Sequence, residues 1–296
     1  MLDKNIDRKK NIVNESLQYI PGTNQPLMSV VEISDSGTCN RKCSFCPRSD
    51  KNYPDIKEFI EPSLHKKIFS ELAQYNYKGM IIYSGFVEPL LNKNIFSNIK
   101  EARSYLPEAK IEIITNGDVL NIDRLKKLFD SGLSTLLISV YDGPEDEKKF
   151  YDLCERAKLK KNQYVIRNRY LPPEEDFGLT FSNRSGNLKN ADYAVPPLEK
   201  SLHTKCNYPA YTFFVDYNGD VLMCSHDWGK KYILGNLKQQ TILDIWLSNK
   251  FLLARKLLLN KNRNFSPCNK CDVKGGLIGN KHAQKWLENL SNETLA

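Results

Sequence analysis

The sequence has no apolar run near the roughly 20 residues that a membrane-spanning helix needs. It starts with MLDKNIDRKKNIVNE, a polar stretch without the apolar segment of a secretory signal. We therefore expect a cytoplasmic protein with no membrane segment. Apolar residues make up 41% and charged residues 26% of the 296 residues, which is typical of globular proteins.

The sequence also lacks segments in which basic and aromatic residues alternate, as in single-strand binding grooves, so nucleic acid is not an expected partner. The formal net charge is +8, and from residue 202 onward 13 Lys and Arg stand against seven Asp and Glu. Two interpretations of this excess stay open. It forms a basic face that steers an acidic partner, or it reflects a Lys and Asn bias spread over solvated surfaces.

Histidine is scarce, with four residues, whereas there are eight cysteines. In a long chain expected in the cytoplasm, thiols stay reduced, and clustered cysteines bind metal ions or clusters more often than they form disulfides. Cys154 stands alone on an expected helix, where a cysteine is usually a small buried hydrophobe. The other seven lie at positions 39, 43, 46, 206, 224, 268 and 271.

Strand-like and helical segments alternate along the first two thirds of the chain. The expected strands are 29–37, 79–85, 110–117, 134–143, 163–170 and 177–186, and the expected helices are 63–75, 94–106, 121–132 and 144–161. This alternation predicts an α/β fold with a parallel sheet and right-handed crossovers. Because there are fewer than eight units, we expect a partial (βα)6 TIM-like barrel.

The pattern changes near residue 200. Two apolar runs meet at Asn218–Gly219, a strong signal for a β-hairpin. An amphipathic helix is expected over 241–259 and a last helix over 281–292. We therefore predict an N-terminal extension (1–28), the barrel (29–200) and a small α+β cluster-binding domain of hairpin and helices (201–296).

The stretch CNRKCSFC places Cys39, Cys43 and Cys46 in a C-x3-C-x2-C spacing directly after the first expected strand. The carboxyl ends of parallel strands carry the ligand site in such sheets. Three thiolates on one loop can hold three irons of a [4Fe–4S] cluster and leave the fourth iron open. A zinc site completed by a distant His is the alternative, because none of the four His lies in the loop.

This spacing, with Phe45 before the third cysteine, resembles the signature of the radical S-adenosylmethionine (SAM) enzymes. The resemblance implies that the open iron binds the amino and carboxylate groups of SAM. Reductive cleavage of SAM then gives a 5′-deoxyadenosyl radical, which abstracts hydrogen from the substrate. The segment YSGFVEPLL (83–91) resembles the Gly-Glu-Pro motif of the family, with Gly85 and Glu88 as candidate cofactor contacts. Val87 stands where the family often has Gly.

Further segments resemble later motifs of the same family. IITNG (113–117) resembles the strand that reaches the SAM ribose, with Thr115 and Asn116 as candidate contacts. FSNRSGNL (181–188) resembles a late-strand motif in which an Arg, here Arg184, faces SAM or substrate. Phe45 and Ser139 are further candidate cofactor contacts, and Arg184 and Tyr141 are the catalytic candidates.

The other four cysteines form C-x12-G-x4-C (Cys206 to Cys224) and CNKC (Cys268 and Cys271). This arrangement resembles the auxiliary iron–sulfur domain of the SPASM type. Since no cysteine follows Cys271, it resembles the shortened relative called Twitch, which implies one auxiliary [4Fe–4S] cluster with four thiolate ligands. A structural zinc, or His226 in place of one cysteine, are the alternatives.

The resemblance as a whole implies a radical SAM oxidoreductase that acts on a small polar metabolite: a sugar, an amino sugar or an aminocyclitol. The auxiliary cluster would accept an electron, and a low-potential protein such as flavodoxin or ferredoxin would donate one. The alternative is a peptide maturase that epimerises or crosslinks a ribosomal peptide. Only about 28 residues precede the first strand, too few for a folded peptide-recognition domain. A remote alternative is a non-catalytic metal-binding scaffold.

Overall fold

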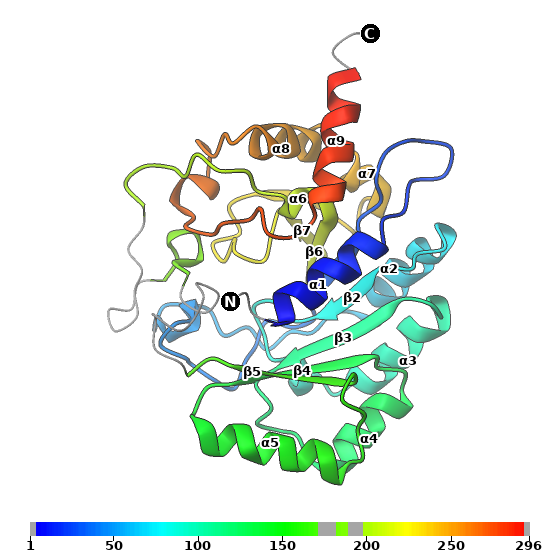
Figure 1. The fold of residues 1–296 in the computed structure, drawn as a ribbon, viewed down its shortest axis with the longest axis vertical. Helices are drawn as coiled ribbons and strands as arrows, with labels where there is room; N and C mark the ends of the chain where they lie inside the picture. Colours follow the sequence, from blue (N-terminus) through cyan, green and yellow to red (C-terminus); the bar gives the residue numbers. More distant parts are fainter. Residues whose placement is uncertain (1–3, 171–181, 189–197, 293–296) are drawn as a thin grey trace.

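A computed structural model describes residues 4–170, 182–188 and 198–292. Its first part alternates strands and helices, as the sequence predicts (Figure 1). The strands are β1 (Val30–Ser34), β2 (Met80–Tyr83), β3 (Lys110–Thr115), β4 (Thr135–Val140) and β5 (Tyr164–Asn168). The helices are α1 (Lys4–Glu15), α2 (Pro62–Gln74), α3 (Ile95–Tyr105), α4 (Ile122–Asp130) and α5 (Pro144–Arg156).

The five strands pair side by side in the order β5-β4-β3-β2-β1, all parallel. Each crossover between them contains one helix, and α2 to α5 cover one face of the sheet (Figure 1). Local sequence sets the helix starts. The side chain of Asn121 accepts a hydrogen bond from the backbone N–H of Arg124, and Pro144 occupies the first turn of α5, where its missing N–H costs nothing. The prediction of an α/β partial barrel is confirmed.

The C-terminal part adds strands β6 (Thr212–Asp216), β7 (Asp220–Leu222) and β8 (Ile233–Asn236), and helices α6 (Tyr208–Tyr211), α7 (Ile242–Trp246), α8 (Asn249–Leu259) and α9 (Asn280–Asn292). The predicted hairpin is present: β6 and β7 pair antiparallel across a turn in which Gly219 has φ +91°. The single helix expected over 241–259 is two helices. Ser248 interrupts it, because its side chain caps the start of α8 by accepting from Phe251 N–H.

The sixth parallel strand differs from the prediction. Strand β6 pairs parallel to β1, with five partners from Val30↔Thr212 to Ser34↔Asp216. The expected strand 177–186 lies outside the described residues up to 181, and Arg184–Gly186 is a 3-10 turn, η4. Arg184 and Ser185 have φ of 49° and 55°, a left-handed conformation that no strand adopts. The part of this segment that the structure describes is therefore not a strand.

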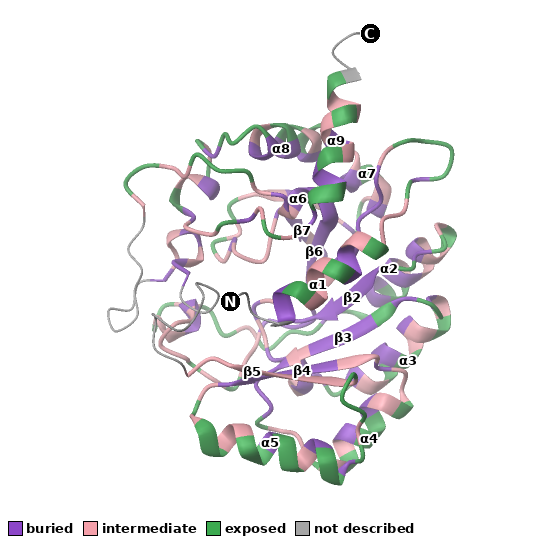
Figure 2. Ribbon diagram, in the orientation of Figure 1, coloured by how far each residue is buried: buried purple, intermediate pink, exposed green. Residues whose placement is uncertain are grey.

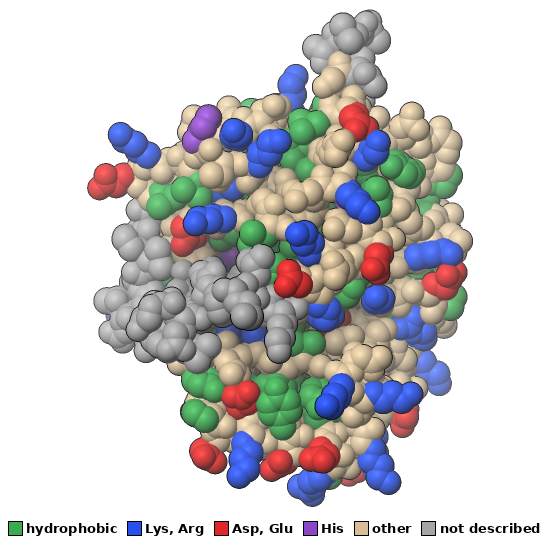
Figure 3. Space-filling model, in the orientation of Figure 1, with side chains coloured by type: hydrophobic (Ala, Val, Ile, Leu, Met, Phe, Trp, Pro, Cys, Tyr) green, Lys and Arg blue, Asp and Glu red, His purple; other side chains and the backbone are tan. Residues whose placement is uncertain are grey.

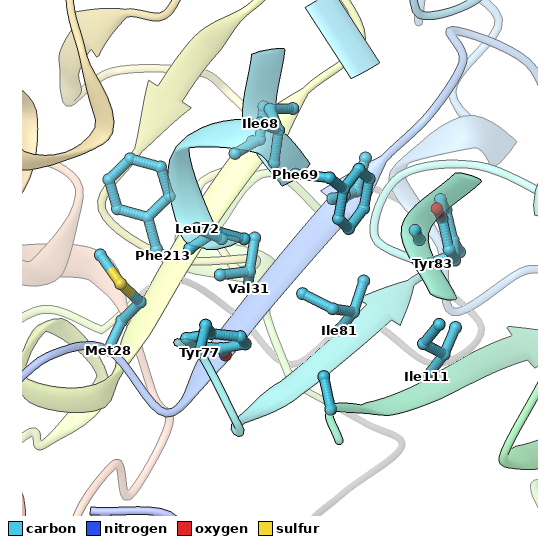
Figure 4. Close-up of a cluster of buried hydrophobic side chains, with 14 of the residues drawn as sticks. Met28, Val31, Ile68, Phe69, Leu72, Tyr77, Ile81, Tyr83, Ile111 and Phe213 are labelled. Carbon is cyan, nitrogen blue, oxygen red and sulfur yellow. The ribbon is translucent and has the colours of Figure 1, made fainter. Parts of the chain in front are cut away.

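The main apolar core lies between the sheet and its helices, and the two parts of the chain share it. In Figure 4, Phe69 and Leu72 of α2 pack against Val31 of β1 and Ile81 of β2, and Phe213 of β6 joins the same cluster. The strands at the centre of Figure 2 are accordingly mostly buried. The C-terminal part therefore extends the barrel sheet.

Helix α1 covers the opposite face of the sheet. Its Ile12 and Val13 pack against Val30 and Met80. These two residues point away from α2 to α5, because successive residues of a strand face opposite sides of the sheet. Arg8 of α1 also pairs with the buried Glu112 of β3 at 2.5 Å. The sequence did not predict this helix as part of the barrel.

No described helix is long and apolar enough to cross a membrane. Lys and Arg side chains are spread over the face shown in Figure 3, with Asp and Glu among them.

Candidate active site

The three-cysteine loop follows β1 and is held at the carboxyl ends of its neighbours. Arg41, inside the loop, donates to Asp118 after β3 at 2.7 Å and to Asp142 after β4 at 2.7 Å. Its guanidinium also lies 5.3 Å from the ring centre of Tyr141. These contacts fix the loop over the end of the sheet, as the parallel topology predicts.

Cys39, Cys43 and Cys46 lie close together and are half-buried. Burial, and then the neighbouring thiols of Cys46 and Cys39, raise the pKa of the Cys43 thiol to about 12. Bound iron would offset this cost, because a positive ion favours the thiolate. Phe45 stacks on Tyr141 with ring centres 5.3 Å apart, which closes one side of the loop.

Glu88 connects two of the predicted motifs. Its buried carboxylate accepts hydrogen bonds from the hydroxyl of Thr115 at 2.7 Å, from Asn116 N–H at 2.8 Å and from Leu90 N–H at 3.0 Å. Burial raises the pKa of Glu88 to about 7. Glu88 thus positions the loop after β3, and with it the candidate ribose contacts.

Gly85 and Val87 have steric roles in the same motif. Gly85 has φ +93°, and a Cβ there would meet the Phe214 ring of β6 at 2.9 Å. Val87 packs against the apolar cluster of Phe86, Phe214 and Leu222. The departure from the family pattern at Val87 therefore adds an apolar contact between the barrel and the C-terminal part.

The inner face of β4 and β5 supplies polar groups. Ser139 is buried, and its hydroxyl accepts a hydrogen bond from Arg167 at 3.1 Å. Arg167 and Arg169, for which a surface position was the favoured expectation, both line the cavity described below.

Arg184 lies between the two cysteine sets. The turn that carries it is anchored on the C-terminal part, since Asn183 N–H donates to Asp272 at 2.9 Å and the Asn183 amide donates to Lys270 O at 2.7 Å. The charge of Arg184 reaches both the Cys46 thiol and the His226 imidazole.

The second set gathers four cysteines from distant parts of the chain. Cys268 begins the short turn η5 (Cys268–Lys270) and Cys271 follows it directly, and both are buried. Burial, and then the thiols of Cys268, Cys271 and Cys206, raise the pKa of Cys224 well above its usual value, so all four thiols are near one another. A Cβ at Gly275 would overlap the sulfur of Cys206, so only glycine leaves that thiol its place.

His226 stands apart as a cavity residue. Its Nδ1 lies 3.3 Å from the Ser182 hydroxyl, and its ring packs edge-on against Tyr208. Burial lowers the pKa of His226 to about 3, so the imidazole is neutral. Within the described residues, no three His, Cys, Asp or Glu side chains lie close enough to bind a single metal ion. A four-iron cluster is larger, and its thiolate ligands lie farther apart.

A cavity of about 350 Å³ connects these groups, a volume within the usual range for small-molecule sites. Residues from both parts of the chain and from α1 line it. The lining includes every candidate cofactor and catalytic residue: Cys39, Cys43, Phe45, Cys46, Gly85, Glu88, Thr115, Asn116, Ser139, Tyr141 and Arg184. It also includes Ser225 and His226, which follow Cys224 directly.

Comparison with known proteins now decides the family. The model of the radical SAM superfamily matches residues 33–168, and that of an iron–sulfur cluster-binding domain, SPASM, matches residues 206–272. An S-adenosyl-L-methionine-dependent 2-deoxy-scyllo-inosamine dehydrogenase of Niallia circulans is 31% identical over 248 residues, which cover 83% of this chain and 93% of that protein. The chain belongs to the radical SAM superfamily.

Solved structures agree with this assignment. The crystal structure of BtrN in complex with AdoMet (SAM) and 2-DOIA superposes with a TM-score of 0.71 at 28% identity, over 84% of this chain and 94% of BtrN. BtrN in an open conformation gives a TM-score of 0.62 at 25% identity, over 83% and 93%. anSMEcpe with bound AdoMet, at 14% identity and a TM-score of 0.54 over 91% and 98%, shows the same fold only.

This radical SAM protein is an enzyme, an oxidoreductase with SAM and iron–sulfur clusters as cofactors. The donors present fit these groups: three thiols lie on one loop beside a cavity, and four further thiols lie near one another, with Gly275 packed against that of Cys206. Once bound, cluster and SAM supply a carbon radical that can abstract an unactivated hydrogen. The protein's own residues position the loop (Arg41), order the loop after β3 (Glu88) and enclose the cavity.

Sequence reasoning missed several cavity residues. Lys9 of α1, Glu32 of β1, and Tyr208 and Ser225 of the C-terminal part all line the cavity. Glu32 left a signal, because it is a charged residue inside the apolar strand VVEIS. Lys9 left none, since nothing in a polar N-terminal stretch shows which face meets the barrel.

Proposed function

We propose that this enzyme oxidises a secondary alcohol of an aminocyclitol or amino sugar to a ketone. The observation that carries the proposal is the similarity to the 2-deoxy-scyllo-inosamine dehydrogenase, which extends over 93% of that protein. The position of the cavity supports it, because one continuous cavity reaches the three-cysteine loop and the residues Ser225 and His226 beside Cys224. A substrate there lies within reach of both cysteine sites.

The reaction balances as the loss of two hydrogens from the alcohol. The C–H bond breaks homolytically, and the hydrogen atom ends on the 5′ carbon of 5′-deoxyadenosine. The hydroxyl would then release its proton, and a cluster held by Cys206, Cys224, Cys268 and Cys271 would serve as the acceptor of the remaining electron. A cluster with four thiolate ligands has no open iron for substrate, which suits it to accepting an electron.

Residue roles belong to the same proposal. Cys39, Cys43 and Cys46 ligate the SAM-binding cluster, and Cys206, Cys224, Cys268 and Cys271 ligate the auxiliary cluster. The residues Phe45, Gly85, Glu88, Thr115, Asn116 and Ser139 contact or position SAM, and Arg184 and Tyr141 face the reacting carbon. The division into an extension (1–28), a barrel (29–200) and an auxiliary domain (201–296) is likewise proposed.

The test is anaerobic turnover. Reconstituted enzyme receives SAM, dithionite and 2-deoxy-scyllo-inosamine, and products are followed by mass spectrometry. We expect 5′-deoxyadenosine together with a cyclitol product two hydrogens lighter. If 5′-deoxyadenosine forms while aminocyclitols and amino sugars keep their mass, the proposal is wrong. Epimerisation of an added peptide, which leaves its mass unchanged, would instead support a peptide maturase.

We further propose that a flavodoxin or ferredoxin reduces the enzyme in the cytoplasm. The excess of 13 Lys and Arg over seven Asp and Glu from residue 202 onward favours an acidic donor. Reduction by such a donor should slow as ionic strength rises, because salt screens attraction between exposed charges. A reduction rate that does not change with salt would contradict this electrostatic docking.

A further inference from the structure

Lys9 of α1 and Glu32 of β1 both line the cavity, and the charge of Glu32 acts on Lys9. Both come from segments without any family motif. Ile12 and Val13 pack α1 onto the inner face of the sheet, and the ion pair of Arg8 with Glu112 fixes its rotation. The packing of α1 and this ion pair therefore place the neighbouring Lys9 at the cavity.

Glu32 is a carboxylate with only neutral donors. The Ser84 hydroxyl donates to its Oε1 at 2.7 Å, and the Ser225 hydroxyl also bonds to it. No Lys, Arg or His of the described residues forms an ion pair with it. Burial raises the pKa of Glu32, and the charge of Lys9 opposes this rise. Among the described residues, Glu88 is the other carboxylate that lines the cavity, and it accepts three hydrogen bonds.

Lys9 is the complementary case. Its ammonium makes no hydrogen bond or ion pair with any residue in the described ranges, although Glu112 and Glu32 attract it electrostatically. Glu112 gives one carboxylate oxygen to Arg8, and its other oxygen is buried without a partner. A half-buried ammonium and a half-buried carboxylate that do not bond to each other both gain from a ligand that bonds to each.

The chemistry of that ligand follows from the pair. Lys9 can only donate hydrogen bonds and an ionised Glu32 can only accept them, so the group that suits both is one that donates and accepts. A hydroxyl group donates one hydrogen bond and accepts others, and it satisfies both. The hydroxyls of Ser84, Ser225 and Tyr208 beside them also favour a polyol.

We propose that Lys9 and Glu32 bind one ring hydroxyl of the substrate, with the ammonium donating to it and the carboxylate accepting from it. This inference rests on the proposed function and deepens it. It makes α1 a specificity element that selects a polyhydroxylated ring and sets which carbon faces the SAM-binding loop.

The test measures binding without turnover. Enzyme with its clusters and SAM bound, left unreduced, is titrated anaerobically with 2-deoxy-scyllo-inosamine by calorimetry. Lys9→Met and Glu32→Gln should each raise Kd about tenfold or more, because the first removes a charged donor and the second removes the charge of the acceptor. Lys10→Met, which alters the adjacent residue outside the cavity lining, is the matched control and should leave Kd unchanged. The Kd for SAM and the melting temperature report whether either variant acts by general damage.

Deoxy analogues of the same cyclitol, each lacking one hydroxyl, locate the contact. Wild-type enzyme should bind one analogue about tenfold more weakly than the parent, whereas each variant, which keeps one of the two partners, should show a smaller difference between that analogue and the parent. The proposal is overturned if the variants bind the parent as tightly as wild type, if they weaken all ligands including SAM alike, or if wild type binds no cyclitol. Cyclitol binding without oxidation would refute the proposed function and leave this subsite intact.

Discussion

The two cysteine sites of this enzyme are built in opposite ways. The first takes three half-buried cysteines from eight consecutive positions, on a loop tied to the sheet by Arg41. The second takes four cysteines spread over residues 206 to 271, two of them buried at one turn, and depends on close packing such as that of Gly275 against Cys206. A site on one loop can leave an iron open to a ligand, whereas a site assembled by the tertiary fold is closed and also holds that fold together.

The largest expected effect comes from removing the open site. In the Cys39/Cys43/Cys46→Ala variant we expect loss of all SAM cleavage, because no thiolate remains to hold the cluster. Iron per chain should fall from about eight to about four if two four-iron clusters are present. Anaerobic iron and sulfide analysis measures this. A wild type with about four irons and a variant with none would remove the auxiliary cluster from the mechanism.

Removing the closed site should separate the two chemistries. In Cys268/Cys271→Ala we expect 5′-deoxyadenosine to form still, while ketone formation falls roughly a hundredfold or more, about 2.7 kcal/mol on the barrier. Metal analysis of the wild type tests the structural-zinc alternative. Zinc together with only about four irons per chain would contradict the proposal that the four-cysteine site accepts an electron. Ketone formation by Cys268/Cys271→Ala at the wild-type rate would also contradict that role.

A single methyl group should empty the closed site and spare the open one. In Gly275→Ala the new Cβ would overlap the Cys206 sulfur, so we expect loss of about four irons with SAM binding retained. Gly276→Ala is the matched control, because the nearest atom to its Cβ, Lys205 O, is 3.7 Å away. Equal iron content in both variants would show that Cys206 does not ligate the cluster.

The smallest expected effect is the pH dependence of stability that Glu88, beside the three-cysteine site, contributes. Burial raises the pKa of Glu88 to about 7, above its unfolded value of 4.5, so the folded state binds the extra proton. The Glu88 contribution to stability is therefore fully present below pH 4.5 and is lost as pH rises through 7. Between pH 6 and 8 the wild type should lose about 1 kcal/mol relative to Glu88→Gln. Anaerobic urea denaturation of both proteins at pH 6 and pH 8 measures this difference in the free energy of unfolding. An equal change with pH in wild type and Glu88→Gln would refute the raised pKa of Glu88.

Sequence alone predicted those parts of the fold and site that depend on local pattern. The βα alternation, the Asn218–Gly219 hairpin and the gathering of motif residues at the carboxyl ends of strands all follow from periodicity and spacing. Features decided by tertiary contact escaped it. Strand β6 takes the place beside β1 because its apolar residues fit there, and α1 reaches the cavity because Ile12, Val13 and Arg8 dock it. Neither placement leaves a local signal.

The parallel pairing of β6 with β1 has a thermodynamic consequence. Its five paired positions join the segment that gathers the four-cysteine site to the strand that leads into the three-cysteine loop. Any opening that separates the two parts must break this ladder, so both sites exist in the same folded state. Filling either site then stabilises that state, and by linkage the first cluster to be inserted raises the apparent affinity for the second. Maturation of this enzyme is therefore expected to be cooperative, with half-loaded protein the minor species.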